Sequence, residues 1–196
     1  CGNSRTATSN AASAANFGRT HPDHEKRYEV AEEFIDVVRA RRSDISTEEA
    51  REEPVLDSDG VLAALRPGLA ALGYEVETGA GKAQKIARPV LFGEQGEVDL
   101  TYEVDAFHSG HRVVVEVEAG RGAQNNAHYR DIIRASLIVD AEHLVLVTPI
   151  AYRYANKGSD KESKTKAYEA TLKQVEAIYA SQRLVLPLKG ILLVGY

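Results

Sequence analysis

Three carboxylates are spaced so that they could act together: Asp105, Glu116 and Glu118, in the stretch YEVDAFHSGHRVVVEVEAG. The β-branched residues of VVVEV predict a strand, and because side chains alternate across a strand, Glu116 and Glu118 share a face. Asp105 ends a preceding strand-like run, and HSGH between the two runs is typical of a hairpin turn. Three carboxylates gathered at the end of a hairpin repel one another strongly unless a positive charge lies among them.

A divalent cation with hard oxygen ligands is the natural counter-charge for such a cluster. Asp105, Glu116 and the Val117 carbonyl would hold Mg²⁺, with Mn²⁺ as a substitute, and would leave positions for water and a phosphate oxygen. Such an ion lowers the pKa of a bound water and stabilises charge on a leaving oxygen. Glu118 would complete a second metal site or position the attacking water. We therefore expect Asp105, Glu116 and Glu118 to be catalytic residues for phosphodiester hydrolysis.

The same stretch allows other interpretations. A solvated strand face would place Glu116 and Glu118 in water, although the run of three valines before Glu116 favours a buried strand. His108 and His111 flank the turn, where they would act as a base, contact phosphate or simply be exposed. A zinc site needs three or four nitrogen or sulfur ligands, and the sequence has no Cys-His cluster to supply them.

The whole chain has the composition of a globular protein. Its 196 residues are 43% hydrophobic and 27% charged, enough for one domain with a full core. The net charge of -5 gives no global sign of nucleic-acid binding, but metal-binding carboxylates count as negative and local basic patches are compatible with it. The single cysteine, Cys1, excludes an internal disulfide framework. No apolar run approaches a membrane span, so we expect a cytoplasmic protein, with a lipoprotein beginning at Cys1 as a remote alternative.

The elements that would position the carboxylates follow from hydrophobic periodicity. We expect amphipathic helices over about 22–42, 57–72, 124–139 and 164–181. We expect strands over about 74–77, 87–92, 98–107, 112–119, 144–148 and 191–196. In the helix after Glu118, the apolar pattern predicts inward-facing side chains at Tyr129, Ile132, Ile133, Ser136 and Leu137. This order predicts an α/β fold, with a mixed sheet flanked by helices.

This arrangement resembles the PD-(D/E)xK nuclease superfamily. The resemblance rests on Asp-x(10)-Glu-x-Glu on a hairpin, followed by a helix and a buried strand, over roughly residues 97–153. Glu118 stands where the usual motif has lysine and Val104 where it has proline, which points to the BamHI/BglII-type variant of type II restriction endonucleases. The resemblance implies a restriction-endonuclease-like mixed β-sheet core (αβββαβ) with divalent-metal catalysis.

We accordingly divide the chain into a flexible N-terminal segment (1–20), an N-terminal helical region (21–55) and a nuclease-like α/β domain (56–196). The family usually draws one more acid from an early helix, and the sequence does not select among the acids available there: Glu32, Glu33, Asp57 and Asp59.

Several residues are candidates for contact with DNA. Arg121, in a glycine-flanked loop, would reach a phosphate. Gln124, Asn125 and Asn126 would read adenine edges or cap the following helix. Farther along the chain, Arg153 and Lys157 belong to a basic segment that either grips the DNA backbone or forms a solvated loop.

We expect a Mg²⁺-dependent DNA endonuclease that resembles type II restriction enzymes. A homodimer is expected, because cutting both strands of a palindrome calls for two active sites. The alternatives are a repair or mobile-element nuclease of the same fold, and a non-catalytic binding or assembly module that keeps the nuclease-like fold.

Overall fold

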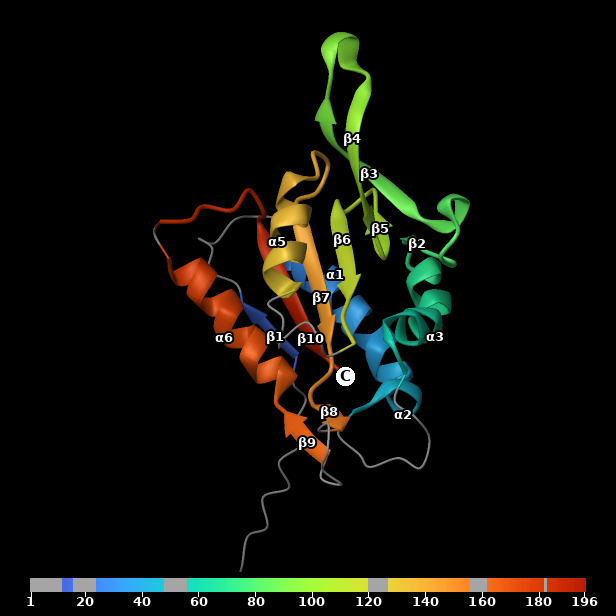
Figure 1. Ribbon diagram of the computed structural model, residues 1–196, viewed down its shortest axis with the longest axis vertical. Helices are drawn as coiled ribbons and strands as arrows, with labels where there is room; N and C mark the ends of the chain where they lie inside the picture. Colours follow the sequence, from blue (N-terminus) through green and yellow to red (C-terminus); the bar gives the residue numbers. More distant parts are fainter. Residues whose placement is uncertain (1–11, 16–23, 48–55, 120–126, 156–161, 182) are drawn as a thin grey trace, which may run out of the picture.

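A six-stranded mixed sheet forms the centre of the computed structural model, which describes residues 12–15, 24–47, 56–119, 127–155, 162–181 and 183–196 (Figure 1). In spatial order the strands are β1 (Ala12–Ala15), β10 (Gly190–Gly195), β7 (His143–Thr148), β6 (Val113–Val117), β5 (Ala106–His108) and β2 (Glu75–Val76). β6, β7 and β10 are parallel to one another, and the outer pairs are antiparallel.

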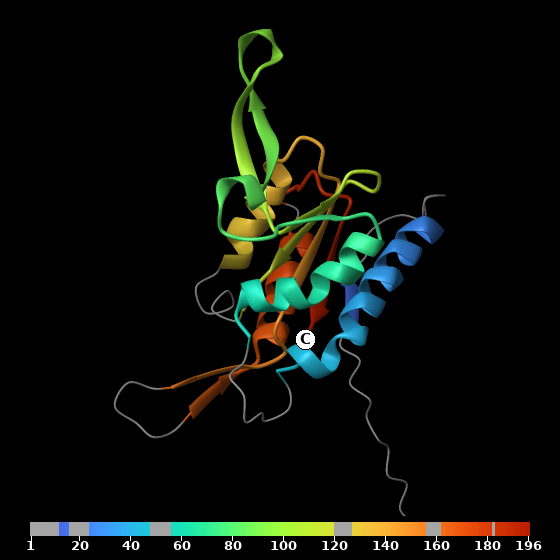
Figure 2. The ribbon, with the colours of Figure 1, turned by 90° about the vertical axis from the view of Figure 1, so that its right-hand side faces the viewer.

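Helices cover both faces of this sheet (Figure 2). The first face packs against α1 (His24–Ala40), α2 (Arg42–Ile45) and α3 (Ser58–Ala71). The second face packs against α5 (Ala127–Leu137) and α6 (Ala167–Ala180). On β6, Val113, Val115 and Val117 belong to the first core and Val114 to the second, as strand alternation requires. The central strand is therefore buried on both faces, which explains its continuous apolar run.

The chain order reproduces the expected core. The central sheet takes β2, β5 and β6 from the chain between α3 and α5, and β7 follows α5, which gives the order helix, three strands, helix and strand. Two further strands, Ile86–Phe92 and Val98–Val104, are inserted between β2 and β5 and form a separate pair. The hairpin turn expected at HSGH joins β5 to β6, with His108 opposite Val113. The α/β class and the mixed sheet flanked by helices are confirmed.

Two antiparallel ribbons project from this core (Figure 1). The first pairs β3 (Ile86–Phe92) with β4 (Val98–Val104) and is preceded by the 3-10 turn Lys82–Gln84 and tipped by the 3-10 turn Glu94–Gly96. The second pairs β8 (Tyr152–Ala155) with β9 (Glu162–Thr165) in a segment where we expected no strand. The strand expected over 98–107 is broken at Asp105 into β4 and β5. Asp105 therefore lies where the chain leaves the first ribbon and enters the central sheet.

The N-terminal segment differs in part from the expectation. β1 pairs with β10 inside the segment 1–20 that we expected to be flexible. The reason is that β10 would otherwise present an unpaired apolar edge, which small alanine and serine residues can cover. The other residues of that segment lie outside the described part of the chain, as does the 48–55 stretch that contains the expected domain boundary.

Among the described residues, none of the helices is both long enough and apolar enough to span a bilayer.

Candidate active site

Asp105 occupies the bend between β4 and β5. Its Oδ2 accepts a hydrogen bond of 2.7 Å from the Val117 N–H, and its carbonyl accepts one of 2.8 Å from the Glu77 N–H. Burial raises the pKa of Asp105 to about 6, with the nearby charges of Glu77 and Asp131 acting in the same direction and the Val117 N–H opposing them. Asp105 and the end of β6 are thus directly connected, as their spacing predicted.

Glu116 lies inside β6, where only 8% of the residue is exposed. It shares strand parity with Val114, so it faces the side of the sheet covered by α5. Burial raises the pKa of Glu116 well above its ordinary value, the charges of Asp105 and Asp131 add to the effect, and Arg134 on α5 opposes it. The interpretation of Glu116 as a solvated surface charge is therefore wrong.

Glu118 follows β6 directly and continues its pairing, because its N–H donates a hydrogen bond of 2.8 Å to the Val147 carbonyl on β7. Its own carbonyl accepts a bond of 2.9 Å from the Tyr196 hydroxyl. Arg130 on α5 reaches its carboxylate at 3.4 Å. Burial and contact with the Asp131 carboxyl raise the pKa of Glu118 to about 8, against the opposing charge of Arg130. A proton therefore occupies this carboxyl over much of the neutral range.

Asp131 is the fourth acid of the cluster, and the sequence analysis missed it. It is fully buried on α5, and its Oδ1 accepts a bond of 2.9 Å from Arg130 Nε. Its Oδ2 is also buried and has no hydrogen-bond partner, while the neighbouring carboxyl is that of Glu118. A buried oxygen without a donor carries a large desolvation cost. This oxygen is therefore suited to a proton or to a cation.

The reason for the omission is the orientation of α5. Tyr129, Ile133 and Leu137 were expected to face the core, but they are 40–47% exposed. The helix instead turns His128 and Asp131, three residues apart and hence on one face, toward the interior. His128 Nε2 lies 2.7 Å from the Thr171 hydroxyl on α6.

The His128–Thr171 contact identifies the protonated ring nitrogen. The Thr171 hydroxyl donates to the Ala167 carbonyl at 2.9 Å, so it accepts from the Nε2–H of His128. Burial lowers the pKa of His128, which favours this neutral form. A polar contact between two helices thus holds α5 in the rotation that brings Asp131 to the acids of β6.

Glu77 and Lys85 form an ion pair on the other side of Asp105. Glu77, just past β2, is 6% exposed, and its carboxylate binds the Lys85 ammonium. The hydrogen bond to Glu77 raises the pKa of Lys85, and the charges of Glu103 and Asp105 add to it. Nothing in the local sequence indicated this pair, because the residues meet only when β2 and β3 are placed beside Asp105.

The acids expected from an early helix have other positions. Asp57 caps α3 by accepting a bond of 2.9 Å from the Gly60 N–H. Burial and, to a lesser extent, the charge of Glu33 raise the pKa of Tyr74, so Glu33 acts on that ring and not on Asp105. Glu77 is the early acid whose charge acts on Asp105.

The histidines of the turn have a structural role. His108 Nε2 lies 3.1 Å from the Leu72 carbonyl, and its Nδ1 accepts a bond of 3.0 Å from the His111 N–H. Both ring nitrogens of His108 are therefore engaged in holding the β5–β6 turn against the end of α3.

The donor set fits a hard divalent cation in its chemistry. The carboxyl groups of Asp105, Glu116, Glu118 and Asp131 lie near one another at the end of β6. The Val117 carbonyl points to the same side of β6 as the Val117 N–H, which donates to Asp105. The buried Asp131 Oδ2 adds an oxygen that has no donor whenever the neighbouring Glu118 carboxyl is ionised. Within the described ranges, however, no three His, Cys, Asp or Glu side chains already stand in the arrangement of a metal site. The residue types suit the ion, and side-chain rotations would have to complete the site.

The expected DNA-contacting residues fall mostly outside the described part of the chain. This holds for Arg121, Gln124, Asn125, Asn126 and Lys157. Arg153 lies on β8, although its side chain is also outside the described set. These assignments stay predictions.

Comparison with curated proteins and with solved structures finds no match to this chain. A family model described as "Putative halobacteria restriction endonuclease" matches residues 21–196. That range contains the whole carboxylate cluster and every strand of the central sheet except β1. The chain therefore belongs to this restriction-endonuclease family.

Proposed function

We propose that this protein is a Mg²⁺-dependent DNA endonuclease of the type II restriction kind, with Asp105, Glu116 and Glu118 at its catalytic centre. The observation that supports the proposal most is the set of buried carboxyls at one end of β6. Asp105, Glu116 and Glu118 all have raised pKa values and lie beside Asp131. A fold gains nothing in stability from such a cluster, so a function that uses it is the better explanation.

Asp105, Glu116 and the Val117 carbonyl are the ligands we assign to Mg²⁺, with Mn²⁺ as a substitute. When bound, the ion supplies a water of lowered pKa and stabilises charge on the leaving oxygen. Glu118 then acts in proton transfer, because a carboxyl whose pKa is raised to about 8 both accepts and releases a proton near neutral pH. This pairing of Glu116 with Glu118 is the Glu-x-Glu arrangement of the BamHI/BglII-type variant.

Lys85 takes the role of a fixed positive charge near Asp105. A raised pKa keeps the ammonium protonated at neutral pH, so Lys85 stabilises phosphate charge and does not act as a base. Because Glu118 stands where the usual motif has lysine, Lys85 would supply the positive charge that is missing from that position.

DNA is the substrate we propose, held by Arg121, Gln124, Asn125, Asn126, Arg153 and Lys157. Two copies of the chain would act together, one on each strand, in the cytoplasm.

The test is cleavage of supercoiled plasmid with Mg²⁺ or with a chelator. The wild-type protein should produce discrete fragments only with the metal, and Glu116→Gln should produce none. Glu142→Gln is the matched control, since it makes the same chemical change at a carboxylate that pairs with Arg112 and Lys189. Cleavage by Glu116→Gln would refute the site. A wild-type protein that neither binds Mg²⁺ or Mn²⁺ in calorimetry nor cuts DNA would be the non-catalytic module instead.

A further inference from the structure

Large apolar side chains are exposed mainly in one region of the molecule. Among the described residues eleven such side chains are exposed, and eight of them belong to the β3–β4 ribbon, to α5, or to the residues just after α5. The remaining three are Leu56, before α3, and the consecutive residues Leu184 and Val185, between α6 and β10. Scattered exposure is ordinary, but a concentration of this kind marks a binding surface.

The β3–β4 ribbon, which we call the arm, has one apolar face. Val98 and Leu100 share strand parity with Val104, which packs in the core that includes α5. Across the ribbon, Phe92 is paired with Val98 and Leu91 with Leu100, because the register shifts between Leu91 and Phe92 and places both consecutive residues opposite the apolar residues of β4. These four side chains are 42–52% exposed. An isolated two-stranded ribbon is marginally stable in water, so an apolar face on it is expected to have a partner.

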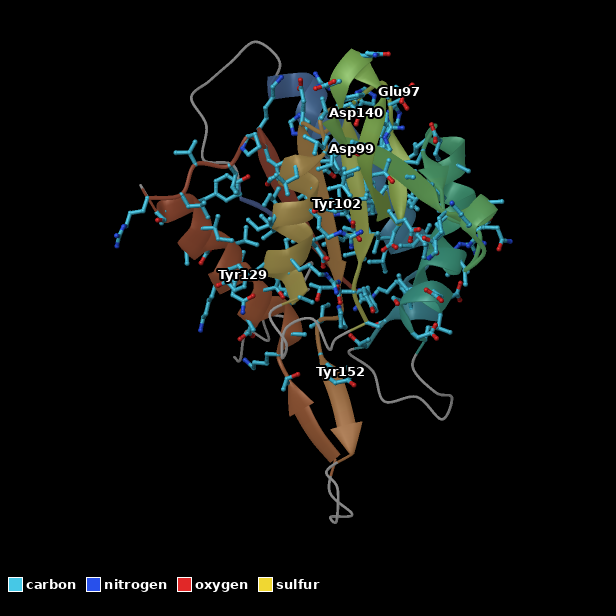
Figure 3. The ribbon with its side chains drawn as sticks, turned by 45° about the horizontal axis from the view of Figure 1, so that its top comes forward. Glu97, Asp99, Tyr102, Tyr129, Asp140 and Tyr152 are labelled. Carbon is cyan, nitrogen blue, oxygen red and sulfur yellow. The ribbon has the colours of Figure 1, made fainter. Side chains whose placement is uncertain are left out.

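The other face and the tip of the arm are acidic. Asp99 and Glu103 alternate with the apolar residues of β4, and Glu94 and Glu97 lie at the tip, all of them exposed. Figure 3 shows Tyr102, Asp99 and Glu97 following one another along the arm toward its tip. Negative charge of this density repels the phosphate backbone. The partner of the arm is therefore not DNA.

The exposed stripe of α5 adjoins the arm. Tyr129, Ile133 and Leu137 follow at intervals of four residues, and Val139, just past the helix, is 54% exposed. The Val139 N–H donates a bond of 3.0 Å to the Pro89 carbonyl on β3. Arg134 on α5 donates a bond of 2.7 Å to the Glu103 carbonyl on β4. These contacts join the two elements into one continuous face, the arm–α5 surface, which Figure 2 shows on the side of the sheet away from α1 and α3.

We propose that the arm–α5 surface is where two copies of this chain bind each other about a two-fold axis. The inference rests on the proposed function in expecting a dimer, and it goes further by naming the surface. The eight residues are 40–54% exposed, so a second copy that covered all of them would bury at most roughly 1,400 Å² in total, which is within the range of specific protein interfaces.

The shape of the surface favours a second copy over another partner. A helix stripe with a four-residue repeat is self-complementary, because ridges formed by such rows pack into the same grooves of an identical helix. A two-fold contact uses the same patch twice, which suits a stripe centred on Ile133.

This contact would also fix the distance between two active sites. α5 carries Asp131 on its inner face and Ile133 on its outer face. The helix that completes the carboxylate cluster of each copy would thus be the helix that meets the other copy. Two catalytic centres held in this way would act on opposite strands of one duplex.

The experiment is sedimentation of the full chain over a range of concentrations. The wild-type protein should form a dimer, whereas Ile133→Glu and Leu100→Glu should sediment as monomers with unchanged circular dichroism. Val185→Glu is the matched control, because Val185 is 89% exposed and lies outside the arm–α5 surface, and it should leave the dimer intact. An equimolar mixture of Ile133→Glu and Ile133→Lys should regain the dimer, since the two charges would meet across the axis.

Two results would overturn the proposal: a wild-type chain that is monomeric at every concentration, or a dimer that survives both Ile133→Glu and Leu100→Glu. The outcome is separable from that of the proposed function. Glu116→Gln, without cleavage, should still form a dimer, and a wild-type dimer that cuts no DNA would refute the nuclease assignment alone.

Discussion

Acidic residues at the two ends of the β6–β7 strand pair have opposite environments. At the end where these strands begin, Glu142 binds Arg112 and Lys189, and the bond to Lys189 is the main reason why its pKa is lowered. At the end where β6 finishes, burial raises the pKa values of Glu116 and Glu118. Both ends belong to the same parallel pair, with Val113 opposite His143 and Val117 opposite Val147.

The contrast separates a carboxylate with a structural role from those that we propose to be functional. Arg112 and Lys189 neutralise Glu142, so this carboxylate connects the turn that contains Arg112 to the start of β10 and needs no ligand. The acids at the other end repel one another and are incompletely paired, which lowers the stability of the metal-free fold. Such sites are kept when something outside the chain uses them. In open α/β sheets ligands also bind at the carboxyl ends of parallel strands, and this is the end in question.

The largest expected effect is that of Glu116→Gln. Cleavage should fall by at least roughly 100-fold, because even partners that only support metal ligands change activity by up to that factor. The free energy of unfolding of the metal-free protein should not fall, because the substitution removes a buried carboxylate whose charge the protein does not fully neutralise. Plasmid cleavage and urea denaturation in chelator measure the two quantities. If Glu116→Gln lost stability but kept its cleavage activity, Glu116 would be a structural carboxylate, as Glu142 is.

Asp131→Asn is expected to have the next largest effect. It removes the charge that faces Glu118, so the pKa of Glu118 should move down from about 8. Cleavage should decrease by roughly 10–100-fold, with a pH optimum shifted to lower pH. A pH–rate profile measures both changes. Ser136→Ala, elsewhere on α5, is the control, and an unchanged profile for Asp131→Asn would remove Asp131 from the site.

The pH dependence of stability should also distinguish the two ends. The folded-state pKa values of Asp105, about 6, and Glu118, about 8, lie above the ordinary values of 3.8 and 4.5. Between about pH 4 and pH 8 the folded protein therefore binds more protons than the unfolded chain, and its stability falls as pH rises. Mg²⁺ should counteract this loss. Denaturation in chelator at several pH values tests the slope, and Glu118→Gln should flatten the part above pH 6.

Glu142→Gln should have a smaller effect, and it should change stability instead of cleavage. It should cost about 1 kcal/mol of unfolding free energy, the scale of a partly exposed ion-pair network, and leave cleavage unchanged. The loss should be present at neutral pH and should vanish in acid, where the lowered pKa of Glu142 is crossed and the wild-type carboxylate is itself protonated. Thermal melts at two pH values measure it. Reduced cleavage at equal stability would mean that the two ends are functionally linked.

Tyr196→Phe should combine a small loss of stability with a small loss of activity. It removes the hydroxyl that donates to the Glu118 carbonyl at 2.9 Å, so stability should fall by about 1 kcal/mol. Because that bond holds the backbone of Glu118, kcat should fall a few-fold with KM little changed. A change in KM alone would show that Tyr196 acts on substrate binding and not on Glu118.

The sequence predicted that the acids close together along the chain also lie close together in the fold, whereas their catalytic role stays a prediction. The spacing of Asp105, Glu116 and Glu118 on a hairpin was sufficient, because strand parity and the turn fix their placement. Asp131 was missed because the apolar residues of α5 suggested the opposite rotation, and the bond between His128 and Thr171 became visible only when α6 was in place. Glu77 and Lys85 were missed for the same reason: tertiary contacts bring them to Asp105.

The single-residue bend at Asp105 has a mechanical meaning. β4 ends at Val104 in the arm and β5 begins at Ala106 in the central sheet, so one residue joins a projecting ribbon to the central sheet. Its carbonyl is held by Glu77 and its carboxylate by Val117. A change in the angle between the arm and the sheet would therefore act directly on Asp105, the residue that we propose as a metal ligand.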